Sequence, residues 1–195
     1  MVVSLQKIKS EAKRLGVEVA ALRAILEKES SGSGFNADGT PKILYERHIM
    51  YRRLVAHLGS AKALYYTKQY PNLVAQNGYG VGGYGKYSEQ PKKLESAAKI
   101  DRTSALESCS WGIAQIMGYH WKLCGFSSVQ GFVNAMYKSE DSQFEVFVKF
   151  LEGSCIVPYL KKLDWANVAL RYNGKNYKQN NYDVDLQRYY LKFKG

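Results

Sequence analysis

The sequence predicts a mainly α-helical protein with one small β excursion. Apolar residues recur at helical spacing through most of the chain, whereas only one segment, an Asp-Gly turn followed by residues 42–45, has the pattern of a β-hairpin. Of the 195 residues, 46% are hydrophobic and 13% aromatic, which excludes a disordered chain. This length and composition predict a single domain over residues 1–195.

Two helices are expected to follow one another at the start of the chain. Ser4 can cap the first helix, which ends at Gly16. The second ends at residues 30–34, which are rich in serine and glycine, and carries one stripe at helical spacing: Val19, Leu22, Ile25, Leu26 and Glu29. The last position of this inward stripe is therefore a carboxylate.

The middle of the chain combines the β signal with a glycine-rich segment. A short hairpin is expected over residues 35–45, followed by a helix from Arg47 to Gly59. Residues 77–85 hold five glycines among tyrosines and are expected to form a loop at the rim of a binding site. This segment partly matches nucleotide-binding glycine motifs, but it lacks the preceding strand that such motifs need.

The second half of the chain is expected to be helical. Helices are predicted around residues 94–98, 129–137, 144–153 and 164–174, and from Asp183 onward. The apolar segment 110–118 is interpreted as a further, buried helix. No apolar run approaches the roughly 18 residues that a membrane-spanning helix requires.

The chain is strongly basic, because 28 Lys and Arg face 17 Asp and Glu, giving a formal net charge of +11. Such a charge attracts anionic polymers, and aromatic side chains stack on sugars as well as on bases. Nucleic acid and cell-wall glycan therefore both fit the composition. A basic nucleic-acid-binding module is the alternative class to an enzyme.

The cysteines and histidines predict neither a disulfide framework nor a metal site. Cys109, Cys124 and Cys155 are an odd number without a C-x-x-C pair. His120 and Cys124 lie one helical turn apart, but no second pair stands at ligand spacing. We therefore expect no metal and no cofactor.

Glu29 is the most informative position for chemistry. It lies on the inward face at the C-terminal end of its helix, where burial and the helix dipole both favour the protonated carboxyl group. A carboxyl group that keeps its proton near neutral pH can act as a general acid. The alternative is a salt-bridged glutamate at a frayed helix end.

Two other acidic residues are candidates for a second carboxylate. Asp38 follows nine residues later and could face Glu29 across a cleft, as glycoside hydrolysis requires. Asp-Gly is also a common pair in tight turns, so Asp38 could have only a structural role. Glu46 is next to Arg47, which makes a structural ion pair an equal alternative to a catalytic role.

Several segments, in their order along the chain, resemble known motifs. The Glu-Ser pair at 29–30, the segment 110–117 and the Ala-x-x-Tyr-Asn pattern at 169–173 resemble the goose-type lysozyme and soluble lytic transglycosylase superfamily. More closely, the chain resembles the N-acetylmuramidase family of bacteriophage endolysins from Ala21 to Tyr190. The segments that carry this resemblance are 34–39, 43–48, 82–85, 110–112, 115–118 and 172–174.

The resemblance implies a mainly α, lysozyme-like α+β fold of two lobes with the cleft between them. It also implies cleavage of the β-1,4 bond between N-acetylmuramic acid and N-acetylglucosamine in peptidoglycan. By position, Glu29 corresponds to the general acid and Asp38 to the second carboxylate. The positions that correspond to substrate contacts, or are weaker candidates for them, are Gln115, Tyr172, Asn173, Ser110, Ser108 and Glu46.

The resemblance further implies peptidoglycan glycan strands as the partner, with the basic surface attracting anionic wall or outer-membrane polymers. It implies no nucleic acid, no stable membrane insertion and a monomer. Because no signal peptide is recognised, the enzyme is expected to stay in the host cytoplasm until a separate membrane-permeabilising protein releases it. We expect no separate wall-binding domain of the kind that many relatives carry. If the substrate's own 6-hydroxyl attacked at the same site, the protein would be a lytic transglycosylase.

Overall fold

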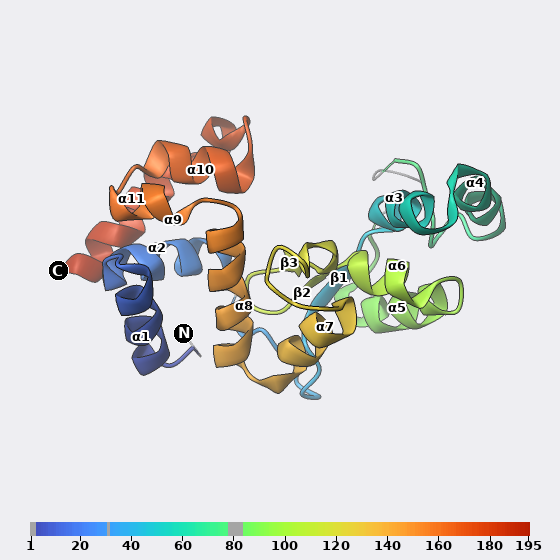
Figure 1. The fold of residues 1–195 in the computed structure, drawn as a ribbon, viewed down its shortest axis with the longest axis horizontal. Helices are drawn as coiled ribbons and strands as arrows, with labels where there is room; N and C mark the ends of the chain where they lie inside the picture. The colour runs from blue at the N-terminus through green and yellow to red at the C-terminus, as the bar shows by residue number, and fades with distance from the viewer. Residues whose placement is uncertain (1–2, 31, 78–83) are drawn as a thin grey trace.

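The structure is a computed structural model that describes residues 3–30, 32–77 and 84–195 (Figure 1). It is mainly helical, with one three-stranded antiparallel sheet in the order β1-β2-β3. The strands are β1 (Ile43–Tyr45), β2 (Cys109–Trp111) and β3 (Ile116–Met117). The α-helices are α1 (Leu5–Leu15), α2 (Val19–Glu29), α3 (Arg47–Leu58), α4 (Ser60–Gln69), α5 (Gln90–Ala98), α6 (Arg102–Glu107), α7 (Val129–Lys138), α8 (Glu140–Gly153), α9 (Val157–Lys161), α10 (Trp165–Asn173) and α11 (Tyr182–Lys194).

Helix boundaries follow the capping residues of the sequence. The Ser4 hydroxyl accepts a hydrogen bond from the backbone of Lys7 and begins α1, which ends at Gly16 in the left-handed conformation. The Asp164 carboxylate caps α10 in the same way through the backbone of Asn167. The predicted extents of α1, α2, α3 and α10 are confirmed. Helices α4, α6 and α9 were not predicted.

The prediction of a helix over residues 110–118 is wrong, because this segment forms β2, a tight turn and β3. Ser110 pairs with Met117 across the turn. The turn requires a positive φ at Gly112 (+69°) and at Gln115 (+49°), which a helix does not provide. A short apolar run suits a buried strand as well as a buried helix, so periodicity could not separate the two.

The hairpin expected over residues 35–45 is confirmed in part. Phe35 and Pro41 form a single antiparallel bridge around the turn, and Gly39 adopts φ +80° there. The strand β1 pairs with β2 from the second half of the chain, with Ile43 opposite Trp111. Residues far apart in sequence therefore supply most of the sheet.

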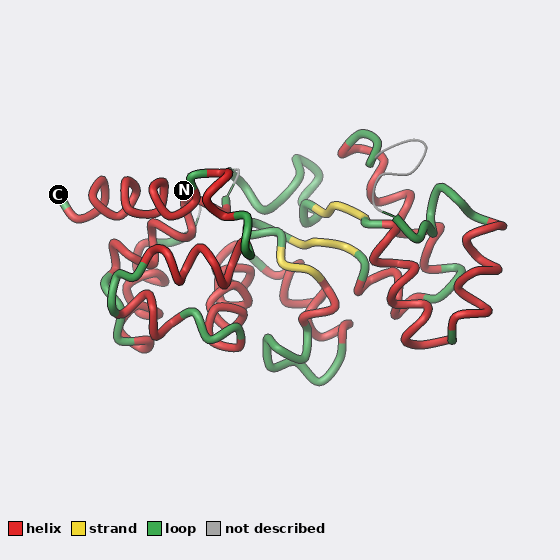
Figure 2. The backbone as a smooth tube through the Cα atoms, turned by 90° about the horizontal axis from the view of Figure 1, so that it is seen from above, coloured by secondary structure: helices red, strands yellow, loops and turns green. Residues whose placement is uncertain are grey.

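The helices form two groups with the sheet between them (Figures 1 and 2). Helices α1, α2 and α8–α11 lie at one end, and α3–α6 at the other (Figure 1). A hydrophobic core runs through both groups and contains Trp111, Phe132, Phe144 and Phe147, each at most 1% exposed. The catalytic candidates from α2, the sheet turn and α10 are therefore attached to a packed scaffold.

Three sequence expectations concern other parts of the fold. The tip of the glycine-rich segment, residues 78–83, lies outside the described residues. Within the described part of the chain, no helix is long and apolar enough to cross a membrane. Cys109, Cys124 and Cys155 are all free thiols.

Candidate active site

Glu29 is the last residue of α2 and is partly buried. The hydroxyl groups of Tyr182 and Tyr172 both donate hydrogen bonds to its carboxylate. Burial raises the pKa of the Glu29 carboxyl, although the two tyrosine hydroxyls and the Lys28 ammonium favour the ionised form. Desolvation therefore outweighs the stabilising contacts, and the carboxyl group holds its proton to a higher pH than an exposed glutamate.

The two tyrosines that contact Glu29 come from different helices and stack on each other. Tyr172 near the end of α10 and Tyr182 at the start of α11 have ring centroids 6.0 Å apart. Phe147 and Phe150 of α8 pack edge-on against Tyr172. The aromatic group fixes both hydroxyls next to the carboxyl group and keeps water from part of it.

A neighbouring ion pair sets the position of Lys28, a cation that lowers the pKa of Glu29. The Lys28 Nζ lies 2.7 Å from the Asp185 Oδ2, and the ammonium also lies over the Tyr182 ring at 5.1 Å. The Asp185 carboxylate thus partly neutralises Lys28. This arrangement limits how far the lysine can stabilise the ionised form of Glu29.

The loop that follows Glu29 is held by two buried polar residues of α8. The Glu140 Oε1 accepts hydrogen bonds from the Ser33 hydroxyl and the Gly34 backbone, both at 2.8 Å. The Gln143 side chain accepts from the backbone of Ile113 at 2.8 Å and donates to the Met136 carbonyl at 2.8 Å and the Gly34 carbonyl at 3.4 Å. Gln143 therefore connects the loop after α2 to the turn between β2 and β3.

Asp38 lies at the exposed turn beyond this loop. Its Oδ1 accepts hydrogen bonds from the Thr40 backbone at 2.9 Å and from the Thr40 hydroxyl at 2.6 Å. These two bonds lower the pKa of the Asp38 carboxyl, so it is ionised at neutral pH. The pKa of Glu29 is therefore raised and that of Asp38 lowered. Such opposite shifts allow one carboxyl group to act as the acid while the other is an anion.

Gln115 lies in the turn between β2 and β3, and hydrogen bonds fix its side chain. Its Oε1 accepts from the Ser110 hydroxyl at 2.8 Å, and its Nε2 donates to the Gly112 carbonyl at 2.8 Å. A non-glycine residue with φ of +49° is strained and is often found at functional sites. Ser110 is only 5% exposed, so it positions Gln115 rather than offering its own surface.

Two adjoining pockets run from the Gln115 side chain to the Asp38 turn. One, of about 290 Å³, is lined by Asn36, Lys42, Tyr87 and Gln115. The other, of about 400 Å³, includes Asn36, Asp38 and Tyr87. Both contain Tyr87, which is 69% exposed. Tyr87 was not predicted as a site residue, although an aromatic residue just after a glycine-rich segment is a signal that could have identified it.

The remaining site candidates lie in different surroundings. Asn173 is exposed at the C-terminal end of α10, next to Tyr172. Ser108 is fully buried and donates its hydroxyl proton to the Ser104 carbonyl at 2.5 Å, so it is part of the core. Glu46 precedes α3, and its Oε2 lies 3.4 Å from the Nε2 of His48. The structure does not bring Ser108 to the two pockets. Tyr182 was also missed, because it lies outside the motif around Tyr172.

The geometry of the histidine and cysteine candidates agrees with packing roles. His120 packs between the rings of Tyr119 and Phe150. Burial lowers the pKa of His120 and raises the pKa of Cys124 to about 12, so the thiol stays protonated. Within residues 3–30, 32–77 and 84–195, no three His, Cys, Asp or Glu side chains are grouped so as to hold a metal ion.

Comparisons with known proteins agree on one family. The family model described as N-acetylmuramidase matches residues 18–194. A crystal structure of the Burkholderia AP3 phage endolysin is similar, with a TM-score of 0.89 and 42% sequence identity over 99% of this chain and 72% of that chain. The search of curated proteins gives no match. The structural likeness confirms the mainly α, lysozyme-like fold class. The chain therefore belongs to the N-acetylmuramidase family and is a glycoside hydrolase that degrades peptidoglycan.

Proposed function

We propose that this muramidase cleaves the β-1,4 bond between N-acetylmuramic acid and N-acetylglucosamine, with Glu29 as the general acid. The protonated Glu29 carboxyl donates its proton to the glycosidic oxygen as the bond breaks. The observation that carries this proposal is the raised pKa of Glu29 in a partly buried site with two tyrosine hydroxyls on its carboxyl group. The tyrosines orient the group, and after proton transfer they stabilise the carboxylate that remains.

Asp38 supplies the negative charge that the reaction needs on the substrate side. Its carboxylate is ionised and is oriented by Thr40, so it can activate a water molecule or stabilise an oxocarbenium-like sugar. Its exposed position at the turn leaves the second oxygen available, since Oδ1 accepts both bonds from Thr40. The turn therefore orients the carboxylate without neutralising it.

The residues that contact the glycan are proposed from the two adjoining pockets and from the end of α10. Gln115 and Tyr87 line the pockets, where an amide can hydrogen-bond an N-acetyl group and a ring can stack on a sugar face. Asn173 is exposed beside Tyr172 and is proposed to contact the sugar next to the acid. Ser110 acts through Gln115. Glu46 contacts the imidazole ring of His48 and is assigned no direct role.

The biological role that fits this activity is lysis of a host cell as a phage endolysin. The structural match to a phage endolysin over nearly the full length of this chain supports this role. The net charge of +11 favours association with anionic wall polymers. We propose that the enzyme acts as a monomer on glycan strands and reaches the wall through a separate membrane-permeabilising protein.

Digestion of purified peptidoglycan tests the acid and the reaction type together. Wild type should release muropeptides, and Glu29→Gln should lose activity by about 10²-fold or more, because the amide has no proton to donate. Equal release by both proteins would refute the role of Glu29. Mass spectrometry of the products separates hydrolysis, which leaves reducing ends, from transglycosylation, which leaves anhydromuramic ends. Glu27→Gln is the matched control, since it removes a partly exposed carboxylate from the same helix.

A further inference from the structure

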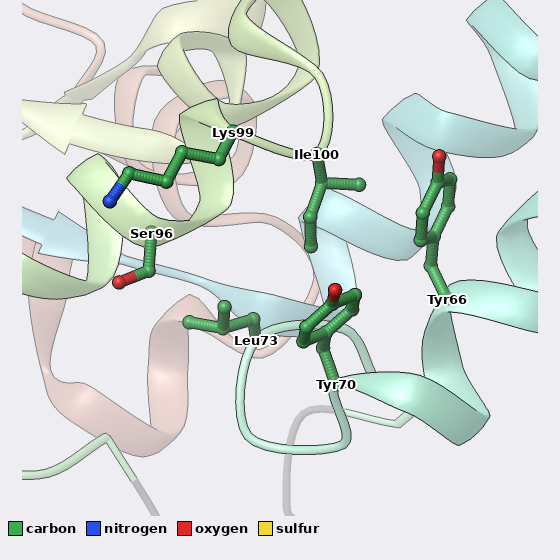
Figure 3. Close-up of a pocket in the computed structure, with 6 residues that line it drawn as sticks. All are labelled: Tyr66, Tyr70, Leu73, Ser96, Lys99 and Ile100. Carbon is green, nitrogen blue, oxygen red and sulfur yellow. The ribbon is translucent and has the colours of Figure 1, made fainter.

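A third cavity lies between α4 and α5, in the helix group at the opposite end of the molecule from α2 and α10 (Figure 1). It has a volume of about 500 Å³ and is lined by Tyr66, Tyr70, Leu73, Ser96, Lys99 and Ile100. This volume lies within the range of ligand-binding pockets. Figure 3 shows Tyr66 on α4 and Tyr70 directly after this helix on one side of the cavity, and Ser96 on α5 and Lys99 directly after that helix on the other.

The two tyrosines form an aromatic platform. Their ring centroids are 6.4 Å apart with an interplanar angle of 30°, and Tyr70 is 47% exposed. Among the described residues, no side-chain hydrogen bond engages either hydroxyl group. An exposed tyrosine ring with a free hydroxyl has an apolar face and a polar edge. A pyranose ring also has an apolar face and polar hydroxyl groups, so the two can stack and hydrogen-bond.

The polar side of the cavity adds a positive charge. Lys99 has a side chain that is 77% exposed, and its nearest acidic partner, Glu95, lies 4.0 Å away and is equally exposed. Such a loose surface pair leaves the ammonium available to a stronger anion. Ser96 adds a hydroxyl group close by, on the same helix.

The surroundings of the cavity are also basic. Residues 47–107, which contain α3–α6, hold ten Lys and Arg and four Asp and Glu, so this part contributes 10 − 4 = +6 of the net charge of +11. The cavity therefore fits an anionic carbohydrate better than a neutral one. A peptidoglycan strand has this chemistry, because its peptide stems carry carboxylates along a chain of pyranose rings.

We propose that this cavity is a second glycan-binding site that holds a peptidoglycan strand through Tyr66, Tyr70 and Lys99 while another part of the polymer is cleaved at Glu29. The proposal rests on peptidoglycan being the substrate. Binding at a site outside the cleft makes cleavage of an attached polymer an intramolecular event, which raises the effective concentration of substrate. The site increases activity on insoluble sacculi and leaves turnover of short soluble fragments unchanged.

Tyr70→Ala and Lys99→Ala test the site with little risk to folding. The interactions that fix Tyr70 in the fold are made by its backbone, which donates to the Tyr66 carbonyl at 2.8 Å and accepts from Leu73 at 2.9 Å. The matched controls are Tyr65→Ala, an even more exposed tyrosine on α4, and Lys92→Ala, an exposed lysine on α5. Neither control residue lines the cavity.

Binding is measured by sedimentation with purified sacculi, using the Glu29→Gln background so that the polymer stays intact. Tyr70→Ala should weaken binding about fivefold. Lys99→Ala should weaken it about threefold at low salt and less at high salt. In the active protein, the same two variants should slow digestion of sacculi and leave a soluble tetrasaccharide unaffected. Both controls should behave as wild type. Binding to chitin beads, which lack carboxylates, should be weakened by Tyr70→Ala and unchanged by Lys99→Ala.

Three results would overturn the proposal: unchanged binding of both variants to sacculi, an equal loss in the two controls, or a loss confined to lipopolysaccharide vesicles. Failure of the catalytic assignment gives a different result. In that case Glu29→Gln would release muropeptides as wild type does, while comparison of each cavity variant with its control in sedimentation would still report whether the cavity binds the glycan.

Discussion

The Gln143 side chain occupies the space that a Cβ atom on Gly34 would need. A Cβ built there lies 1.9 Å from the Gln143 Oε1 and 2.8 Å from the backbone nitrogen of Ile113. Gly112 is close to the same amide, with its Cβ position 2.7 Å from the Gln143 Cδ. The loop after Glu29 and the turn that carries Gln115 thus approach one buried amide from two sides. The absence of side chains at both glycines permits this contact.

Substitution at this contact should show strong energetic coupling. Gly34→Ala and Gln143→Ala should each destabilise the fold by about 2–4 kcal/mol, the first through a clash and the second through buried groups left unpaired. In the double variant the clash with the amide is relieved and only the close approach to the Ile113 backbone nitrogen remains, so the losses should not add. Urea unfolding of the four proteins measures the coupling. Strict additivity within about 0.5 kcal/mol would contradict the contact.

The raised pKa of Glu29 predicts how stability depends on pH. The folded state binds the proton more tightly than the unfolded chain, so this contribution is fully present below the ordinary pKa of glutamate, 4.5, and is lost as the pH rises through the raised value. Glu29→Gln should therefore gain stability relative to wild type between acidic and neutral pH. Each unit of pKa difference corresponds to about 1.4 kcal/mol.

Thermal unfolding of both proteins over this pH range measures the difference. Glu27→Gln, on the same helix, serves as the control for loss of a charge and should show no comparable gain. A constant difference between wild type and Glu29→Gln at all pH values would mean that the carboxyl group has the same pKa in the folded and unfolded states.

Tyr182→Phe should shift the pH profile of activity to the alkaline side. The Tyr182 hydroxyl favours the ionised form of Glu29, so its removal raises the pKa of the acid further. The alkaline limb of kcat/KM, where the acid loses its proton, then moves to higher pH. Tyr189→Phe, which removes a hydroxyl elsewhere on α11, should leave the profile in place. A shift to lower pH would contradict the hydrogen-bond assignment.

Asp38→Asn separates a chemical role of Asp38 from a role in the turn. Asparagine keeps an oxygen that can accept from the Thr40 backbone and suits the turn as well as aspartate does. If the negative charge is needed, Asp38→Asn and Asp38→Ala should both lose most activity while staying folded. Full activity of Asp38→Asn would assign the residue to the turn alone. Circular dichroism and release of muropeptides are the two measurements.

Tyr87→Ala should weaken substrate binding more than it slows the chemical step. Tyr87 is the most exposed aromatic ring along the two adjoining pockets, where it can stack on a sugar face. KM should rise about tenfold with little change in kcat, whereas Tyr87→Phe should stay near wild type. Tyr65→Ala is the control for loss of an exposed tyrosine. A fall in kcat at constant KM would place Tyr87 in the chemical step instead.

Local signals in the sequence predicted much of the helical structure and the position of the acid. Serine and aspartate caps and terminal glycines set the limits of α1 and α10, because capping depends on residues within one turn. The carboxylate of Glu29 was recognised because it follows an apolar stripe on its own helix. These features depend on near neighbours and can be read without the tertiary structure.

The parts that could not be predicted depend on residues distant in sequence. The strand β2 is defined by pairing with β1, more than 60 residues earlier in the chain, so its apolar segment alone suited a helix equally well. Gln143 lies in the polar first turn of α8, and only the approach of two glycine-containing turns gives its amide a role. Ser108 lies just before the segment 110–117 that carries the resemblance, yet the fold places its side chain in the core.

The contact between Tyr182 and Glu29 joins residues 153 positions apart in the chain. A ribosome therefore completes α2 long before it makes α11, the helix that packs against α2 and helps to bury the carboxyl group. Until α11 docks against α2, Glu29 of the unfinished polypeptide is exposed to water and has the pKa of an ordinary glutamate. The enzyme therefore becomes active only after α11 has been synthesised. A chain truncated before residue 182 should lack a Glu29 carboxyl group with a raised pKa.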